Sequence, residues 1–218
     1  MAESHSPIVV IGLGRFGASL AQHLVARGLH VLCVDSDMEA VQAHAETLPQ
    51  VVRADGTDAE TFRQLGIHAG WRAVVAIGDL QQSLVTTTVL RELGVGDIWA
   101  KALSERHALI LERLGATHVV QPEAELGSRV SHLLVGHLLD YLPVDEDYSV
   151  AKTPVPDYAA GQPLGSSRIR ERHGVRVIAV KRSGGEMLEA EPETIPLLGD
   201  TLVVWGRTDL VERFSEST

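Results

Sequence analysis

The chain has 218 residues, 44% of them hydrophobic, and a formal net charge of -10 at pH 7. This length is enough for one medium domain and one small one, and the acidic charge argues against a nucleic-acid binder, which needs a basic face. Cys33 is the only cysteine, so a disulfide framework and a thiolate metal site are excluded and a cytoplasmic location is expected. No segment is predicted to span a bilayer.

The first predicted element is a buried parallel strand over residues 8–11, which leads directly into the pattern Gly12-x-Gly14-x-x-Gly17 and then into a helix. This order of strand, glycine turn and helix is typical of a nucleotide-binding turn. Gly12 would allow the tight turn, Gly14 would let a phosphate approach the backbone, and Gly17 would let the helix pack closely on the strand. The free N–H groups at the helix start would hold an anion. The alternative is an ordinary strand-to-helix turn.

Two charged residues, one within this pattern and one after it, are candidates for binding the ligand. Arg15 lies at the helix start, where its guanidinium can pair with phosphate oxygens; its alternative is a surface arginine. A second strand over residues 31–34 ends at Asp35, the position where an acidic residue binds a ribose hydroxyl. A carboxylate there also repels a 2′-phosphate, which disfavours NADP. The alternative for Asp35 is an N-cap of the next helix, a role that Asp37 fits equally well.

The next part of the chain continues to alternate. Strands are expected over residues 51–52, 73–77, 98–100 and 118–120, and helices over 38–48, 59–65, 81–93, 105–114 and 126–142. Six alternations predict an α/β fold, a Rossmann-like doubly wound parallel sheet. Asp55 and Thr57 follow the third strand, where they either border an adenine pocket or cap the next helix. Lys101 ends the fifth strand, where it either meets phosphate or is a solvated surface lysine.

The regular alternation of predicted strands and helices ends at residues 143–149, which indicates a first domain over residues 1–142 and a second over 143–218. Strands over 148–155, 175–180 and 201–206, a hairpin turn at 182–185 and helices over 166–173 and 209–214 predict a small α+β C-terminal domain. The histidines are scattered without the spacing of a zinc site, and no nucleophile, base and orienting residue form a catalytic set.

Taken together, these motifs resemble the regulatory subunits of bacterial Ktr/Trk potassium uptake systems. Those subunits join an RCK (regulator of potassium conductance) nucleotide-binding domain to a small RCK C-terminal domain. The resemblance is carried by residues 12–17, 34–35, 55–58, 75–78, 98–102, 122–123, 165–180 and 199–202. It runs in order over nearly the whole chain. Because the chain has one two-domain unit, it is similar to the Ktr-type subunit and not to the double-length Trk-type one.

The resemblance implies a regulator and not an enzyme. Such subunits bind ATP or ADP, and NAD(H) in Trk-type members, and they gate a potassium-translocating membrane protein. They form homodimers that assemble into an octameric ring on the cytoplasmic face of the membrane. The resemblance therefore implies a protein that is peripheral to the membrane through its partner, without direct membrane insertion and without nucleic acid. The helix that begins at Gln81 or the one that begins at Leu126 would contribute to pairing.

The resemblance also implies roles for single residues. The nucleotide-binding set would be Gly12, Gly14, Arg15, Phe16, Gly17, Asp35, Asp55, Thr57 and Lys101. Arg15 would reach the terminal phosphate, and Glu123 would help hold a divalent or sodium cation near the γ-phosphate at the dimer interface. In some relatives the C-terminal dimer binds cyclic di-AMP, and the corresponding region here contains Arg168, Ile169, Arg172, His173 and Ile178. The alternative for that charged helix is a solvated face.

Two other functions compete with this interpretation. An NAD-dependent oxidoreductase needs a domain that positions substrate and a proton relay, whereas the second domain here is short and contains one histidine, His173. An NADH-responsive redox sensor that contacts DNA needs a basic recognition helix, and the acidic charge argues against it.

Overall fold

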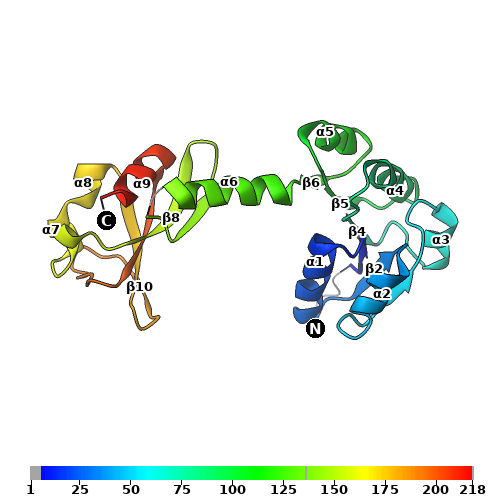
Figure 1. Ribbon diagram of the computed structural model, residues 1–218, viewed down its shortest axis with the longest axis horizontal. Coiled ribbons are helices and arrows are strands. Elements are labelled where there is room, and N and C mark those ends of the chain that lie inside the picture. Colours follow the sequence, from blue (N-terminus) through cyan, green and yellow to red (C-terminus); the bar gives the residue numbers. More distant parts are fainter. Residues whose placement is uncertain (1–5, 136, 218) are drawn as a thin grey trace. The chain divides into compact units, whose positions relative to one another are not determined.

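The computed structural model describes residues 6–135 and 137–217 (Figure 1). The chain divides into two compact units, Met1–Pro122 and Glu123–Thr218, which we call the N-terminal and C-terminal units. This division lies earlier in the chain than the change of composition at residues 142/143. Within the described ranges, no helix combines the length and the apolar character that crossing a membrane requires.

The N-terminal unit alternates strand and helix from its first element. Its elements are β1 (Ile8–Ile11), α1 (Arg15–Ala26), β2 (Val31–Asp35), α2 (Met38–His44), β3 (Val51–Arg53), α3 (Ala59–Gln64), β4 (Arg72–Val75), α4 (Leu80–Glu92), β5 (Asp97–Lys101), α5 (Glu105–Arg113) and β6 (His118–Val120). The strands form one parallel sheet in the order β3-β2-β1-β4-β5-β6. The predicted Rossmann-like doubly wound fold is confirmed. The strand order reverses between β1 and β4, which opens a crevice at their carboxyl ends.

Helices cover both faces of this sheet, and the sequence of β1 reflects that. Val9 and Ile11 point into a core shared with α3, α4 and α5, while Ile8 and Val10 point into a second core shared with α1 and α2. Because successive side chains of a strand face opposite ways, a strand covered on both sides needs an apolar residue at every position. All four residues of β1 are buried, so the start of the glycine turn is held firmly in the sheet.

The C-terminal unit is built around an antiparallel sheet. The elements that follow β6 are α6 (Pro122–Val135), β7 (Asp140–Pro143), β8 (Tyr148–Pro154), the 3-10 turn η1 (Asp157–Ala159), α7 (Leu164–Ser167), α8 (Ile169–His173), β9 (Arg176–Lys181), β10 (Met187–Glu189), β11 (Thr201–Arg207) and α9 (Thr208–Ser215). The sheet order is β10-β9-β11-β8-β7. Phe214 of α9 and Leu202 of β11 are fully buried in its core. The predicted small α+β domain and the hairpin turn at 182–185 are confirmed, because that turn joins β9 to β10.

Two helix predictions in this unit are wrong. The helix expected over residues 126–142 is instead α6, which ends at Val135, and the separate strand β7. Tyr141 of β7 pairs with Ala151 of β8 and is buried, whereas the following Leu142 is exposed, which is the alternation of a strand. The helix expected over residues 166–173 is divided into α7 and α8 at Arg168, which has a left-handed backbone with φ 56°.

Polar contacts attach α6 to the rest of its unit. Asp140 of β7 accepts hydrogen bonds from Arg129 of α6 and from Lys152 of β8, the latter at 3.0 Å. His132 of α6 lies 2.5 Å from Glu212 of α9 and stacks on the ring of Tyr141. The hydrogen bonds from Lys152 and Arg129 lower the pKa of the Asp140 carboxyl from 3.8 to about 2. The physical reason for the early division of the chain is therefore that α6 is bonded to β7 and to α9.

The pKa of Asp140 predicts how acid weakens the C-terminal unit. A carboxyl whose pKa is lowered by folding stabilises the fold above its unfolded pKa and loses that effect as the pH falls through the folded value. Asp140→Asn should therefore lower the melting temperature at neutral pH, and the difference from the unaltered protein should shrink between about pH 4 and about pH 2. Thermal unfolding of the full chain across that range measures the difference. Glu146→Gln, an exposed loop carboxylate removed in the same way, is the control, and a difference for Asp140→Asn that is independent of pH would contradict the assignment.

Candidate functional site

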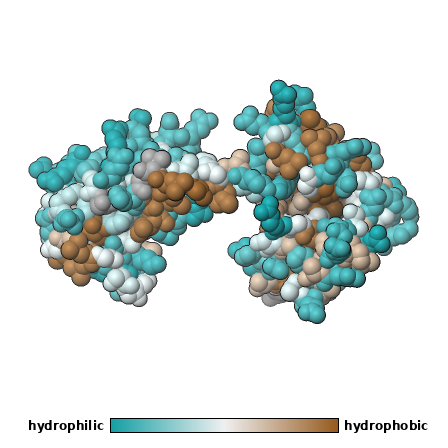
Figure 2. Space-filling model, viewed as in Figure 1, coloured by the Kyte–Doolittle hydropathy of each residue, from teal (hydrophilic) through white to brown (hydrophobic). Residues whose placement is uncertain are grey.

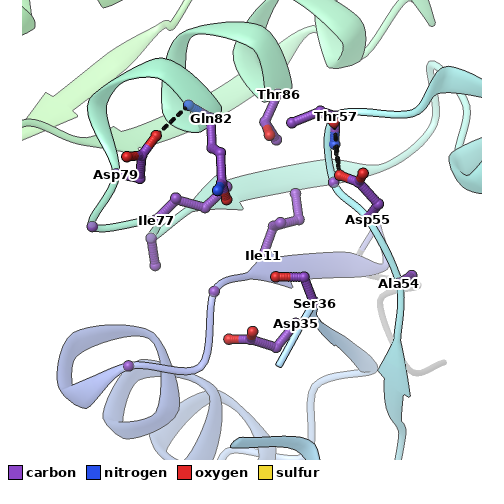
Figure 3. Close-up of a pocket in the computed structure, with 15 residues that line it drawn as sticks. Ile11, Asp35, Ser36, Ala54, Asp55, Thr57, Ile77, Asp79, Gln82 and Thr86 are labelled. Atoms are coloured by element: carbon purple, nitrogen blue, oxygen red, sulfur yellow. Dashed lines mark hydrogen bonds between the residues drawn. The ribbon is translucent and has the colours of Figure 1, made fainter. Parts of the chain in front are cut away.

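A cavity of about 250 Å³ lies at the carboxyl ends of β1, β2, β3 and β4 (Figure 3). This is the edge of the sheet where its strand order reverses. Its walls come from the loops after these four strands and from the first turns of α4. The lining residues are Ile11, Gly12, Gly14, Asp35, Ser36, Ala54, Asp55, Gly56, Thr57, Ala76, Ile77, Gly78, Asp79, Gln82 and Thr86.

The glycine turn forms the wall between β1 and α1. Gly12 has φ +98°, and a Cβ atom there would lie 2.9 Å from the carbonyl carbon and oxygen of Ala76. A Cβ atom on Gly17 would overlap the carbonyl oxygen of Gly12. Gly14 differs, because a Cβ atom there would meet nothing within 4 Å. The fold therefore requires glycine at positions 12 and 17, whereas Gly14 faces open space that a ligand can occupy.

The start of α1 has the properties of an anion site. Gly14 is its N-cap residue, no side chain caps the helix, and its first turn contains no acidic residue. The first backbone N–H groups of a helix have no partner within the helix, and the helix dipole makes this end positive. Arg15, the first residue of α1, is exposed and adds a charge that pairs well with phosphate.

Asp35 links the end of β2 to the glycine turn. Its Oδ2 atom accepts a hydrogen bond from the backbone N–H of Leu13 at 2.6 Å, and its Oδ1 atom accepts one from Asp37 at 2.9 Å. The N-cap of α2 is Asp37, whose side chain accepts from Glu39. The capping alternative for Asp35 therefore does not apply. A carboxylate has about four acceptor positions, so Asp35 retains capacity for ligand hydroxyl groups.

Asp55 and Thr57 form a turn that follows β3 and lines another wall of the cavity. The Oδ1 atom of Asp55 accepts hydrogen bonds from the backbone N–H of Thr57 at 2.9 Å and from its hydroxyl at 2.7 Å. The residue that caps α3 is Asp58. A Cβ atom on Gly56 would lie 2.9 Å from Ile11. This turn therefore packs closely on β1, and both predicted residues line the cavity without capping a helix.

The other predicted site residues do not line this cavity. Arg15 and Gly17 lie in the first turn of α1, and Phe16 borders a different hollow of about 450 Å³ together with Trp99. Lys101 is half-buried at the end of β5. Glu123 lies in α6, in the other unit. No group of three or more His, Cys, Asp or Glu side chains in the described ranges is arranged to hold a metal ion. The roles of Lys101 and Glu123 remain predictions.

Sequence reasoning missed one wall of the cavity. Ile77, Gly78 and Asp79 follow β4, and Gln82 and Thr86 belong to α4. Gly78 and Asp79 had a recognisable signal, because they follow a predicted strand and so lie at the edge of the sheet that binds ligands. Gln82 and Thr86 had none, because a helix pattern does not tell which polar residues face a neighbouring loop.

The chemistry of the cavity is that of a binding site. The carboxylates of Asp35, Asp55 and Asp79 each accept at least one backbone N–H, so part of their charge is already compensated by the loops. A second hollow of about 510 Å³ shares several residues with the cavity and adds Arg53. The two hollows together offer an anion-binding helix start, acceptors for ribose hydroxyls and a recess for a base. This set of groups fits a nucleotide.

Comparison with known proteins relates both units to one family. Residues 8–122 match the TrkA-N domain and residues 150–217 match the TrkA-C domain. The chain is 34% identical over 209 residues to the Ktr system potassium uptake protein C of Bacillus subtilis, covering 95% of each chain. The solved structure of the GsuK RCK domain superposes with a TM-score of 0.68 at 21% identity, covering 99% of this chain and 48% of that one. The GsuK channel bound to NAD superposes with a TM-score of 0.65 at 20% identity, covering 100% and 40%.

The glycine geometry predicts a large loss of stability for one substitution in the turn and almost none for another. Gly12→Ala should lower the free energy of unfolding by about 1–3 kcal/mol or more, because alanine disfavours positive φ and its methyl group would collide with Ala76. Gly14→Ala should change it by less than about 0.5 kcal/mol, because its methyl group enters open space. Urea unfolding of the full chain, followed by circular dichroism, distinguishes the two. Equal stability of the two variants would contradict the turn geometry.

Proposed function

We propose a function from one premise: this chain belongs to the family of potassium uptake proteins that join a TrkA-N domain to a TrkA-C domain. The resemblance to Ktr/Trk regulatory subunits that the sequence motifs indicated is thereby confirmed. In our proposal the chain is a nucleotide-binding regulatory subunit that gates a potassium-translocating membrane protein in response to ATP and ADP. The observation that carries it is the cavity at the reversal of strand order, with an uncapped helix start at one end.

The proposed ligand is an adenine nucleotide. Phosphates would lie at the start of α1, where no side chain caps the backbone N–H groups and Arg15 is the first helical residue, and Asp35 would accept the ribose hydroxyls. Asp55 and Thr57 would border the base, and Lys101 would approach the phosphates. The GsuK channel has been solved bound to NAD, which supports NAD(H) as an alternative ligand. The carboxylate of Asp35 disfavours a 2′-phosphate and therefore NADP.

The proposed regulation requires two states of the protein. A ligand shifts an equilibrium only by the difference between its affinities for the two states. ATP and ADP differ in the γ-phosphate, so the residues that discriminate between them must lie near it. Arg15 is our candidate, and Glu123 would help hold a divalent or sodium cation near the γ-phosphate at the dimer interface.

The surface of α6 supports assembly into homodimers. Leu126, Val130 and Leu134 repeat at intervals of four residues and are 60%, 41% and 80% exposed. Figure 2 shows the hydrophobic surface that runs along this helix. Exposed apolar stripes of this kind favour contact with another protein. Following the family, we propose that dimers form an octameric ring at the cytoplasmic face of the membrane, peripheral to it through the potassium-translocating partner, without membrane insertion or nucleic acid.

A second ligand is proposed for the C-terminal unit. A groove of about 500 Å³ is lined by Arg168, Ile169, Arg170 and Arg176 together with Glu171, Glu191 and aliphatic neighbours, and Arg168 pairs with Glu171. Arginine side chains beside an apolar residue suit a ligand with phosphates and a base. This supports cyclic di-AMP as the second ligand, although Arg172, His173 and Ile178 are not part of the groove.

Calorimetric titration tests the proposal directly. The protein should bind ATP and ADP, and Gly14→Asp should abolish both, because a carboxylate would fill the phosphate approach with negative charge. Gly14→Ala is the matched control, which should fold normally and keep the glycine turn. Retained affinity in Gly14→Asp would contradict the phosphate assignment. Failure of ATP, ADP and NADH to bind, or binding of NADH alone with turnover of a hydroxy acid, would overturn the proposal.

Arg15 provides a sharper test of the proposed sensing. Arg15→Gln should weaken ATP roughly tenfold and ADP distinctly less, since a hydrogen bond to a charged group contributes about 1.5–3 kcal/mol. Arg27→Gln, at the other end of α1, removes the same charge away from the cavity and should leave both affinities unchanged. The dissociation constants come from the same titrations. An equal loss of ATP and ADP affinity would assign Arg15 to a phosphate that the two ligands share.

A further inference from the structure

Gln82 lies in the first turn of α4 and lines the cavity from a different wall than the glycine turn and Asp35. The side chain of Asp79 caps this helix by accepting the backbone N–H of Gln82 at 2.8 Å. This cap fixes the first turn of α4 beside the cavity. Figure 3 shows the side-chain amide of Gln82 extending from α4 into the cavity, which Ile11 and Ile77 also line. Gln82 also lines the adjoining hollow with Arg53, so it borders both recesses.

Thr86, on the same wall of the cavity, adds a second polar group that a ligand could contact. It follows Gln82 by four residues, and residues at this spacing share a helix face. Thr86 is fully buried and lines the cavity, and its hydroxyl has no hydrogen-bond partner among the described residues. A buried hydroxyl without a partner is unfavourable. The wall of α4 thus carries hydrogen-bonding capacity that the fold itself does not use.

We propose that Gln82 selects the base of the bound nucleotide and favours adenine, an inference that rests on the proposed nucleotide-binding function. The helix start and Asp35 hold phosphate and ribose, which all nucleotides share, so they do not distinguish one base from another. The amide of Gln82 offers a donor and an acceptor side by side. Adenine carries the complementary pair on one edge, the 6-amino group as donor and N7 as acceptor. Ile11 and Ile77 supply apolar surface for the faces of the ring.

Hypoxanthine is the base that tests this contact. It differs from adenine at position 6, where a carbonyl replaces the amino group, and at N1, which carries a proton, so the edge with N7 presents two acceptors. One amide cannot donate to both and leaves its own oxygen unpaired. Inosine diphosphate therefore keeps the phosphates and the ribose of ADP and changes the hydrogen-bonding pattern that Gln82 would read.

The experiment compares ADP with inosine diphosphate by calorimetry on the full chain. The unaltered protein should prefer ADP by roughly tenfold or more, the discrimination expected of a bidentate amide–base pair. Gln82→Leu, which keeps the size and removes both polar atoms, should bring that ratio close to one. Gln82→Glu keeps an acceptor and loses the donor, so it should weaken ADP and still reject inosine diphosphate. Gln81→Leu is the matched control on the adjacent exposed position and should keep the original ratio.

The outcomes distinguish a failure of the proposed nucleotide-binding function from a failure of the proposed role of Gln82. Binding of neither nucleotide to the unaltered protein overturns the proposed function, and the role of Gln82 with it. Binding with no preference for ADP, or with a preference that survives Gln82→Leu, overturns the role of Gln82 alone. An equal loss of both ligands in Gln82→Leu also overturns it, because that result places the amide on the ribose or the phosphates.

Discussion

The close contact between the glycine turn and the end of β4 is the constraint on which the candidate site depends. Gly12 lies so near the backbone of Ala76 that no side chain fits between them. The neighbouring Leu13 N–H is held by Asp35 at 2.6 Å. One turn is thus attached to three strands, β1, β2 and β4. The direction of α1, and the place where its N–H groups point, follow from these contacts.

Local dipoles would allow an acidic chain to hold the proposed phosphate. The net charge of -10 is a sum over the whole chain, and exposed charges more than about 10 Å apart are largely screened. At the cavity, the carboxylates accept backbone N–H groups, and the start of α1 has backbone N–H groups that no side chain caps. The charge that a ligand meets is therefore decided by the geometry of a few loops and not by the composition of the chain.

In the C-terminal unit, polar contacts attach α6 to the rest of the unit, and α6 also exposes a stripe of apolar side chains. Asp140 and Glu212 hold α6 through Arg129 and His132, while Leu126 and Leu134 face solvent. A helix that is fixed on one side and apolar on another suits an assembly contact. This arrangement gives the proposed regulator a physical connection between its assembly surface and the second sheet.

The sequence by itself determined the N-terminal sheet, the glycine turn and the placing of Asp35, Asp55 and Thr57 at one edge. These features follow from local periods and from short motifs whose spacing is set by backbone geometry. Only the tertiary structure decided that residues 140–143 form β7, because that strand depends on pairing with β8. It alone placed Gln82 and Thr86 in the cavity and Phe16 in a different hollow. A helix pattern defines a buried face, but the direction of each polar side chain depends on how the helix packs against the sheet.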